Sequence, residues 1–293
     1  MPNTFLTPDI IAREALMQLR NNAVMAQLVH RDYSSEFAGA VGDTISIKKP
    51  ASFVAKEFSD EIELQDATED SIDVKLDKFL DVSFKVTSKE MTLDIDDFSQ
   101  QLLIPAMQAF ADKIDKYLLG LASGVTNSVS YTIGSGTARN TIVDARKFLT
   151  DNAVPLTNRN FVFGGNMEAD LLKTDLFTSA EKVGDEGTAL REASLGRKFG
   201  LDMYTDQNVT NTDLMFHKNA FALVTRPLAL PQGSDKSAIV NYDGFGLRVT
   251  YGYDINKKSD IVSIDMLCGV KLLDKKLAAK ITEQAASNGN TGA

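Results

Sequence analysis

The strongest hydrophobic pattern in the chain lies between Phe98 and Ala122, in the stretch FSQQLLIPAMQAFADKIDKYLLGLA. Its apolar residues recur at steps of three and four, which places them on one face of a helix: Met107, Phe110, Ala111, Ile114, Leu118 and Leu121. The charged residues between them are expected mostly on the opposite face, namely Asp112, Lys113, Asp115 and Lys116. An ordinary amphipathic core helix would show the same pattern, so the period alone does not reveal a special role.

Proline and glycine set the ends of this helix. Pro105 lacks a backbone N–H but is tolerated in the first turn of a helix, and Gly120 and Gly124 offer stops. We therefore expect a short helix from Asp97 to Leu103 and then a long one that starts near Pro105. At about 1.5 Å per residue, the long helix would span roughly 28 Å.

A second helical pattern starts at Thr7-Pro8-Asp9, where a capping hydroxyl precedes a proline and an acid. The apolar residues after it follow a rough helical spacing, with a break expected near Asn21 and Asn22. A helix this close to the N-terminus can pack on its own domain or on a neighbouring subunit. Leu16 and Leu19 are our candidate subunit-interface residues in this helix.

From Gly42 the hydrophobic period changes to two, which is typical of strands. Residues 44–48 alternate, a long acidic stretch follows, and residues 72–77 and 82–86 alternate again. This order predicts an extended hairpin that faces solvent or another chain. Apolar and acidic residues are interleaved in it, and four of them are further candidate interface residues: Phe53, Phe58, Glu61 and Glu63.

The rest of the chain alternates short helical and strand patterns. Helices are expected at 142–152 and 168–173, and the second is expected to be capped by Asn166. Strands are expected at 160–164, 199–209, 214–224, 239–240, 248–253 and 261–266, with a strand or loop at 128–137. Residues 178–197 resemble a mobile loop, and residues 282–293 are polar and small enough to predict disorder.

Composition and charge narrow the class of protein. The chain has 293 residues, of which 43% are hydrophobic and 24% charged, so it is long enough for one large or two medium globular domains. No run approaches 18 apolar residues, and no secretory signal is visible, which favours folding in a cytoplasm without membrane contact. The net charge of −9 argues against a basic nucleic-acid binder. Nearly all of it lies between Asp43 and Asp97, with 15 acidic and 7 basic residues.

No catalytic or cofactor motif is present in the sequence. The two histidines, His30 and His217, stand near no motif that needs a base, and no nucleophile elbow, phosphate-binding loop or dinucleotide fingerprint occurs. The acids lack the spacing of a calcium-binding loop, and one cysteine with two histidines nearly excludes structural zinc. Cys268 lies in an apolar run and is expected to be a buried small hydrophobe rather than a nucleophile. We therefore predict no enzyme activity, no cofactor and no metal.

The order of these parts resembles the major capsid proteins of tailed bacteriophages, the Hong Kong ninety-seven type of α+β fold. Several local stretches are similar to P-twenty-two-type coat proteins over roughly residues 5 to 275: TPDIIAREALMQLRNN, RDYSSEF followed by GDTISIKKP, LGRKFGLDMYTDQNV, MFHKNAFALVTRPL and GLRVTYGYDINKKSDIVSIDMLCGVKLLD. In this family the parts are named the N-arm, E-loop, spine helix, peripheral domain and axial domain. Some relatives carry a further inserted domain, for which this chain is too short.

The resemblance implies a division of the chain into six parts. These are an N-terminal arm (1–41), an E-loop hairpin with adjoining strands (42–96), a spine helix with peripheral domain (97–155), a mainly axial domain (156–240), returning strands (241–281) and a disordered tail (282–293). Some family members cross-link a lysine to a neighbour's asparagine, but no local motif assigns such a role to Lys56 or to any other residue.

The resemblance also implies a function. The subunit would assemble in the host cytoplasm into hexamers and pentamers of an icosahedral virion shell around double-stranded DNA. A scaffolding protein and a portal would be its partners, and the DNA would be held without sequence-specific contacts. Two alternatives stay open: a shell protein of the encapsulin type, which has the same fold but encloses enzymes, and an enzyme whose site the sequence does not reveal.

Overall fold

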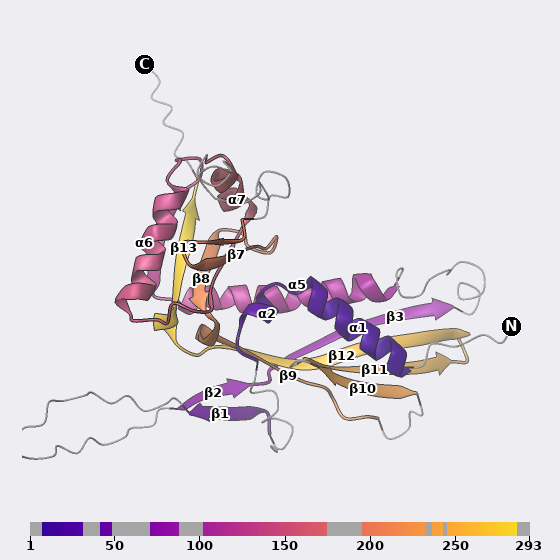
Figure 1. The fold of residues 1–293 in the computed structure, drawn as a ribbon. Helices are drawn as coiled ribbons and strands as arrows, with labels where there is room; N and C mark the ends of the chain where they lie inside the picture. Colours follow the sequence, from indigo (N-terminus) through magenta and orange to yellow (C-terminus); the bar gives the residue numbers. More distant parts are fainter. Residues whose placement is uncertain are drawn as a thin grey trace, which may run out of the picture.

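The structure is a computed structural model, and it describes residues 8–31, 42–48, 71–87, 102–174, 195–231, 236–242 and 245–285. These residues form two bodies, each a sheet covered by helices, and a short two-stranded ribbon (Figure 1). The first body is built on a five-stranded sheet and the second on a six-stranded sheet. Among the described residues, no helix combines the length and apolar character needed to cross a membrane.

One long strand, β12 (Ser259–Leu272), organises the sheet of the first body. Its first part lies between β11 and β3, and its last part pairs with β9, all antiparallel. In β3 the alternation predicted from the sequence is confirmed, because its even-numbered residues from Leu80 to Val86 pack against the core. The other strands of this sheet are β3 (Lys78–Thr87), β9 (Phe221–Arg226), β10 (Ser237–Tyr242) and β11 (Phe245–Asp254).

Helix α5 (Ile104–Gly120) is the long helix predicted from the sequence, and its proline lies in the first turn. Five of the six predicted core residues are buried, while Leu121 is half-buried in the short helix η2 (Leu121–Gly124) that follows. One expectation was wrong. Asp115, which we expected on the polar face, is 2% exposed. The helix predicted at 97–103 lies outside the described residues, apart from Leu102 and Leu103.

Two helices from the N-terminus complete the first core. Helix α1 (Pro8–Asn22) packs on α5 and on β10 and β11, and α2 (Met25–Leu28) packs on α5. The chain therefore breaks after Asn22, as the sequence predicts. The segment then reaches the sheet, where the N–H of His30 donates to the carbonyl of Phe221 at 3.0 Å. Residues 8–31 are thus part of the subunit's own core.

The second body has the strand order β4-β13-β8-β5-β7-β6, with α6 and α7 packed against it. β5, predicted as a buried strand, is buried at all five positions. The elements of this body are β4 (Asn127–Thr132), α6 (Ala138–Asp151), β5 (Arg159–Phe163), α7 (Gly165–Leu172), β6 (Arg197–Lys198), β7 (Leu201–Thr205), β8 (Thr212–His217) and β13 (Ala278–Gln284).

The boundary between the bodies differs from the division that we expected. β4 and α6, expected with the spine helix and peripheral domain, join the six-stranded sheet and its covering helices, while β9 and β10, expected in a mainly axial domain, belong to the first sheet. The stretch 214–224, expected as one strand, forms β8 and β9 in different sheets, separated by η3 (Lys218–Ala220). Long-range strand pairing therefore sets the boundary, and local patterns do not record it.

Two further expectations are corrected. Residues 282–284, expected in a disordered tail, lie in β13 between β4 and β8, and only residues 286–293 fall outside the described part. α7 begins after Gly164, and the side chain of Asn166 donates to Glu283 instead of capping the helix. Most of the predicted loop 178–197 lies outside the described residues.

Candidate subunit interfaces

The ribbon of β1 (Thr44–Lys48) and β2 (Ser71–Lys75) lies at the margin of the first body and projects from it (Figure 1). The two strands pair antiparallel from Thr44 opposite Lys75 to Lys48 opposite Ser71, as expected for the root of an extended hairpin. We call these two strands the hairpin base. Its inner face joins a small apolar cluster of Ile47, Val74, Leu76 and Val224, which fastens it to β9.

The segment that the hairpin base carries lies outside the described residues. This includes all four of its predicted interface residues, Phe53, Phe58, Glu61 and Glu63. Their role as contacts to a neighbour stays a prediction. The hairpin base itself is held by the pairing of β1 with β2 and by packing on β9. Because these two strands are adjacent, the chain leaves the base and returns to it side by side.

Leu16 and Leu19 are buried inside their own subunit. Leu16 is 4% exposed and Leu19 is fully buried, and both belong to the core cluster that α1 forms with α5 and the first sheet. Their neighbour Met17, by contrast, is 63% exposed. Of the two possibilities for this helix, the structure shows packing on its own subunit, and a contact of Leu16 or Leu19 with a neighbour stays a prediction.

Asp115 makes a structural contact that the sequence reasoning missed. It lies on the buried face of α5, and its two carboxylate oxygens accept the N–H of Val24 at 2.9 Å and the N–H of Ala26 at 3.2 Å. It thereby holds the N-terminal segment at the start of α2. Burial raises the pKa of Asp115 to about 7, against these hydrogen bonds, which lower it. The signal was present, because Asp115 follows Ala111 by four residues and precedes Leu118 by three.

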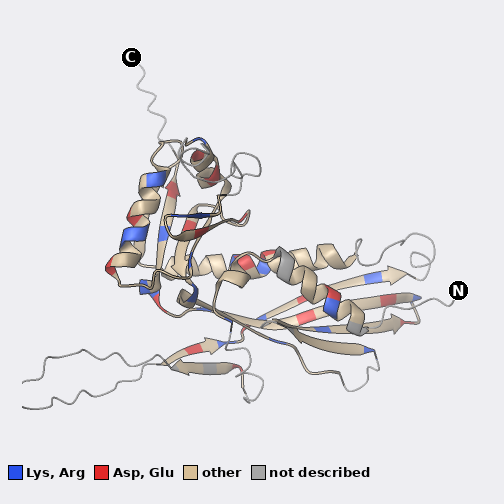
Figure 2. Cartoon of the chain, in the orientation of Figure 1, with Lys and Arg blue, Asp and Glu red and all other residues tan. Residues whose placement is uncertain are grey.

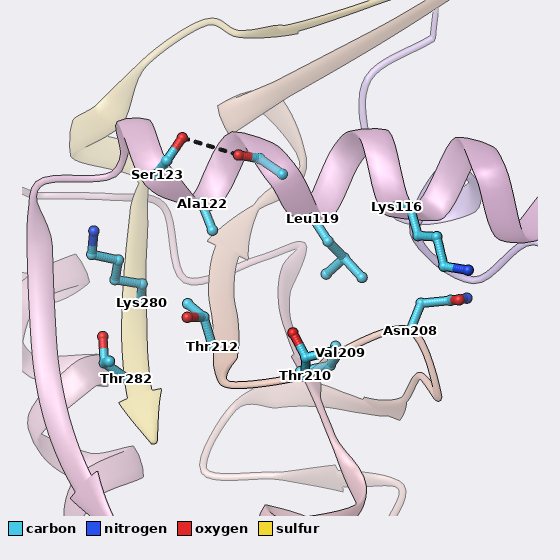
Figure 3. Close-up of a pocket in the computed structure, with 11 residues that line it drawn as sticks. Lys116, Leu119, Ala122, Ser123, Asn208, Val209, Thr210, Thr212, Lys280 and Thr282 are labelled. Carbon is cyan, nitrogen blue, oxygen red and sulfur yellow. Dashed lines mark hydrogen bonds between the residues drawn. The ribbon is translucent and has the colours of Figure 1, made fainter. Parts of the chain in front are cut away.

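A cleft of about 640 Å³ lies between the C-terminal half of α5 and the edge of the second body. We call it the lysine cleft. In Figure 3, Lys116 and Asn208 lie at one end and Lys280 and Thr282 at the other. The residues between them are small, hydroxylated or apolar: Leu119, Gly120, Ala122, Ser123, Val209, Thr210 and Thr212.

The charge of this cleft is its distinctive property. It is lined by two lysines and no acid, in a protein of net charge −9. Elsewhere on the described elements acidic and basic residues are interspersed, as along the strands of the first sheet in Figure 2. Neither lysine of the cleft forms an ion pair among the described residues. The cleft is therefore suited to an anionic group.

No group of three or more His, Cys, Asp or Glu among the described residues is placed to hold a metal ion. Cys268 is buried, as predicted, and burial raises the pKa of its thiol to about 12, so it is not an activated nucleophile. His217 accepts the N–H of Asn219 at 3.2 Å and has a pKa lowered by burial and by the charge of Arg159.

Comparison with known proteins gives no match in sequence but clear matches in structure. No protein-family model matches the chain, and neither does any curated protein. A structure from Mycobacterium phage Che8 superposes with a TM-score of 0.68 and 19% identity, over 88% of this chain and 90% of that one. The capsid structure of cyanophage P-SCSP1u gives 0.59 and 11%, over 84% and 85%.

A virus-like particle from Pyrococcus furiosus is also similar, with a TM-score of 0.54 and 10% identity, over 93% of this chain and 98% of that one. At such identities the likeness concerns the fold, and it extends over nearly the whole of each chain. The chain therefore has the α+β fold of tailed-bacteriophage major capsid proteins, the Hong Kong ninety-seven type.

Proposed function

We propose that this chain is the major capsid protein of a tailed bacteriophage, a structural subunit without catalytic activity. The observation that carries the proposal is the fold, which matches phage capsid structures over more than four fifths of both chains. The paired hairpin base supports it, because a ribbon that projects from its own subunit is suited to contact another one.

The finer proposal is an icosahedral shell of hexamers and pentamers around double-stranded DNA. The net charge of −9 supports containment of DNA by enclosure, because tight phosphate contacts need many lysines and arginines. A scaffolding protein and a portal would be the partners during assembly in the host cytoplasm, and the mature subunit would reside in the virion.

Complementary charge supports a proposal for where neighbouring subunits meet. Residues 59–70 contain six acidic residues and no basic residue, and the lysine cleft has the opposite charge. We propose that Glu61 and Glu63 of one subunit approach Lys116 and Lys280 of the next, with Phe53 and Phe58 adding apolar contacts. Such charge pairs fix the register of an interface more than its affinity.

A second candidate function is a nanocompartment shell of the encapsulin type, which encloses enzymes instead of DNA. The similarity to the virus-like particle from Pyrococcus furiosus, which extends over 98% of that chain, supports keeping it. The two candidates agree on a closed shell of many copies and differ in the cargo.

Electron microscopy of the purified chain tests both. The protein is concentrated in steps, with and without a crowding agent, and is then inspected by negative stain and by sedimentation. Closed shells are the expected result, and their nucleic-acid content after expression in cells separates phage head from nanocompartment. A chain that stays monomeric under every condition, and carries out a reaction on small molecules, would contradict the proposal.

A further inference from the structure

Two carboxyl groups are buried next to each other in the sheet of the second body. In the register of β8 and β13, Asp213 lies opposite Ile281. Glu283 is two residues further along β13, so its side chain is on the same face as Ile281 and diagonal to Asp213. Asp213 is 0% and Glu283 8% exposed. No basic residue among those described forms an ion pair with either.

Each of these carboxyl groups has one satisfied and one unsatisfied oxygen. Oδ1 of Asp213 accepts the N–H of Gly164 at 2.9 Å, and Oε2 of Glu283 accepts an N–H of the Asn166 amide at 2.8 Å. The second oxygens, Oδ2 of Asp213 and Oε1 of Glu283, are buried and have no hydrogen-bond partner. Two buried acceptors without donors are costly, at about 1–3 kcal/mol each.

We propose that Asp213 and Glu283 share one proton and together fasten the start of α7 to the sheet. A proton on Oδ2 of Asp213 donates to the carboxylate of Glu283, which satisfies both unpaired oxygens at once. The outer oxygens then hold Gly164 and Asn166, which lie two residues apart at the beginning of α7. The pair thus joins β8, β13 and α7 through a single proton.

The surroundings favour protonation rather than a salt bridge. From β4, Tyr131 donates to Asp170 of α7, whose other oxygen is bound to Lys173 at 3.1 Å. From the loop before β8, Asp206 adds a further buried carboxyl, one oxygen of which accepts the N–H of Asn208. The one cation in this group is therefore already paired. Burial and the charge of Glu283 raise the pKa of Asp213 to about 8.

The attachment of the start of α7 to the sheet therefore depends on pH. The folded pKa of Asp213 lies above its ordinary value of 3.8. Its contribution to stability is therefore complete below about pH 3.8 and is lost as the pH rises through about 8. Above that pH the carboxyl of Asp213 is ionised, its proton no longer joins the pair, and the start of α7 loosens from the sheet. The inference needs only the folded subunit and does not rest on the proposed function.

The variant Asp213→Asn tests it in the full chain. An amide keeps an acceptor for Gly164 and a donor for Glu283, so it imitates the protonated state at every pH. Infrared difference spectra between wild type and this variant should show a protonated carboxyl band at pH 7 that fades toward pH 9, because the band of Asp115 is common to both proteins and cancels. The fall of Tm between pH 7 and pH 9 should shrink in Asp213→Asn and persist in the exposed control Asp144→Asn.

If Asp213→Asn fails to fold, a second variant, Glu283→Gln, still tests the proposal. Removal of the neighbouring charge should shift the disappearance of the band to lower pH. The proposal is overturned if wild type and Asp213→Asn show the same carboxyl band, or if Asp213→Asn lowers Tm equally at every pH, because Asp213 would then be only an ionised acceptor for Gly164.

Discussion

Gly269 of β12 and the backbone carbonyl of Lys75 are packed so closely that a Cβ atom at Gly269 would come closer than 3.0 Å to the carbonyl oxygen. This approach lets the end of the hairpin base cross β12 in direct contact. Glycine is required there for space, because the strand is extended and its φ is not positive. The hairpin base therefore keeps its direction only because the residue at position 269 is glycine, which has no Cβ atom.

We expect Gly269→Ala to lower the free energy of unfolding by about 1–3 kcal/mol, because a backbone carbonyl cannot move aside as a flexible side chain could. Urea unfolding of the purified subunit measures it. Gly252→Ala in β11 is the matched control, since nothing lies within 4 Å of its added Cβ, and its effect should stay within about 0.5 kcal/mol. Equal effects of the two changes would mean that the close contact is not present in solution.

Leu16→Ala should lower the free energy of unfolding of the isolated subunit by about 2–5 kcal/mol, because the side chain is buried against α5 and the first sheet. Met17→Ala, one residue further along the same helix and 63% exposed, should change it by less than about 0.5 kcal/mol. Denaturant curves of both variants give the comparison. If Leu16→Ala slowed assembly and left subunit stability unchanged, α1 would be an arm for a neighbour after all.

Asp115→Asn should destabilise the subunit by an amount that depends on pH. An amide offers one acceptor to two backbone N–H groups, so about 1–3 kcal/mol is lost. In wild type the folded pKa of about 7 exceeds the ordinary 3.8, so this group's stabilising contribution is present below about pH 3.8 and is lost as the pH rises through 7. The stability difference between wild type and variant should therefore narrow from pH 5 to pH 8. A constant difference in urea unfolding would argue that Asp115 is ionised throughout.

The double reversal Glu61→Lys with Glu63→Lys should slow assembly, measured by light scattering, with little change in Tm. Lys116→Glu with Lys280→Glu should do the same from the other side of the contact. All four changes in one chain should restore the rate, because each acid then meets a base again. Reversal of Arg139 and Lys147 to glutamate on exposed positions of α6 is the control. If the fourfold variant still assembled slowly, the proposed contact between the hairpin and the lysine cleft would be wrong.

The sequence was a good guide to elements with a clear period. The spacing of Met107, Phe110 and Ile114 predicted the long helix and its buried face, and the alternation in β3 predicted which side chains pack inward. The sequence did not predict which strands pair and which elements pack against each other. β4 pairs in parallel with β13, about 150 residues away, and no local pattern records such a pairing.

The residues that were hardest to place from the sequence also depend on partners that a local pattern does not show. Asp115 was assigned to the polar face because it is charged, although its spacing placed it among buried neighbours, and its partners are backbone N–H groups that a sequence does not display. Leu16 and Leu19 form an apolar stripe, but a stripe says only that a helix is covered and not by which chain. The lysine cleft is assembled from three separate stretches, so no single stretch predicts it.

The placement of β12 and β13 in the middle of their sheets has a consequence for synthesis on the ribosome. The first sheet cannot close before residues 259–272 have emerged, and the second cannot close before residues 278–284 have emerged. Strand β3, made early, must wait for its partner β12, with its apolar face exposed in the meantime. A chain that folds while it is synthesised therefore carries an unpaired apolar strand until β12 has been made, and this interval favours aggregation.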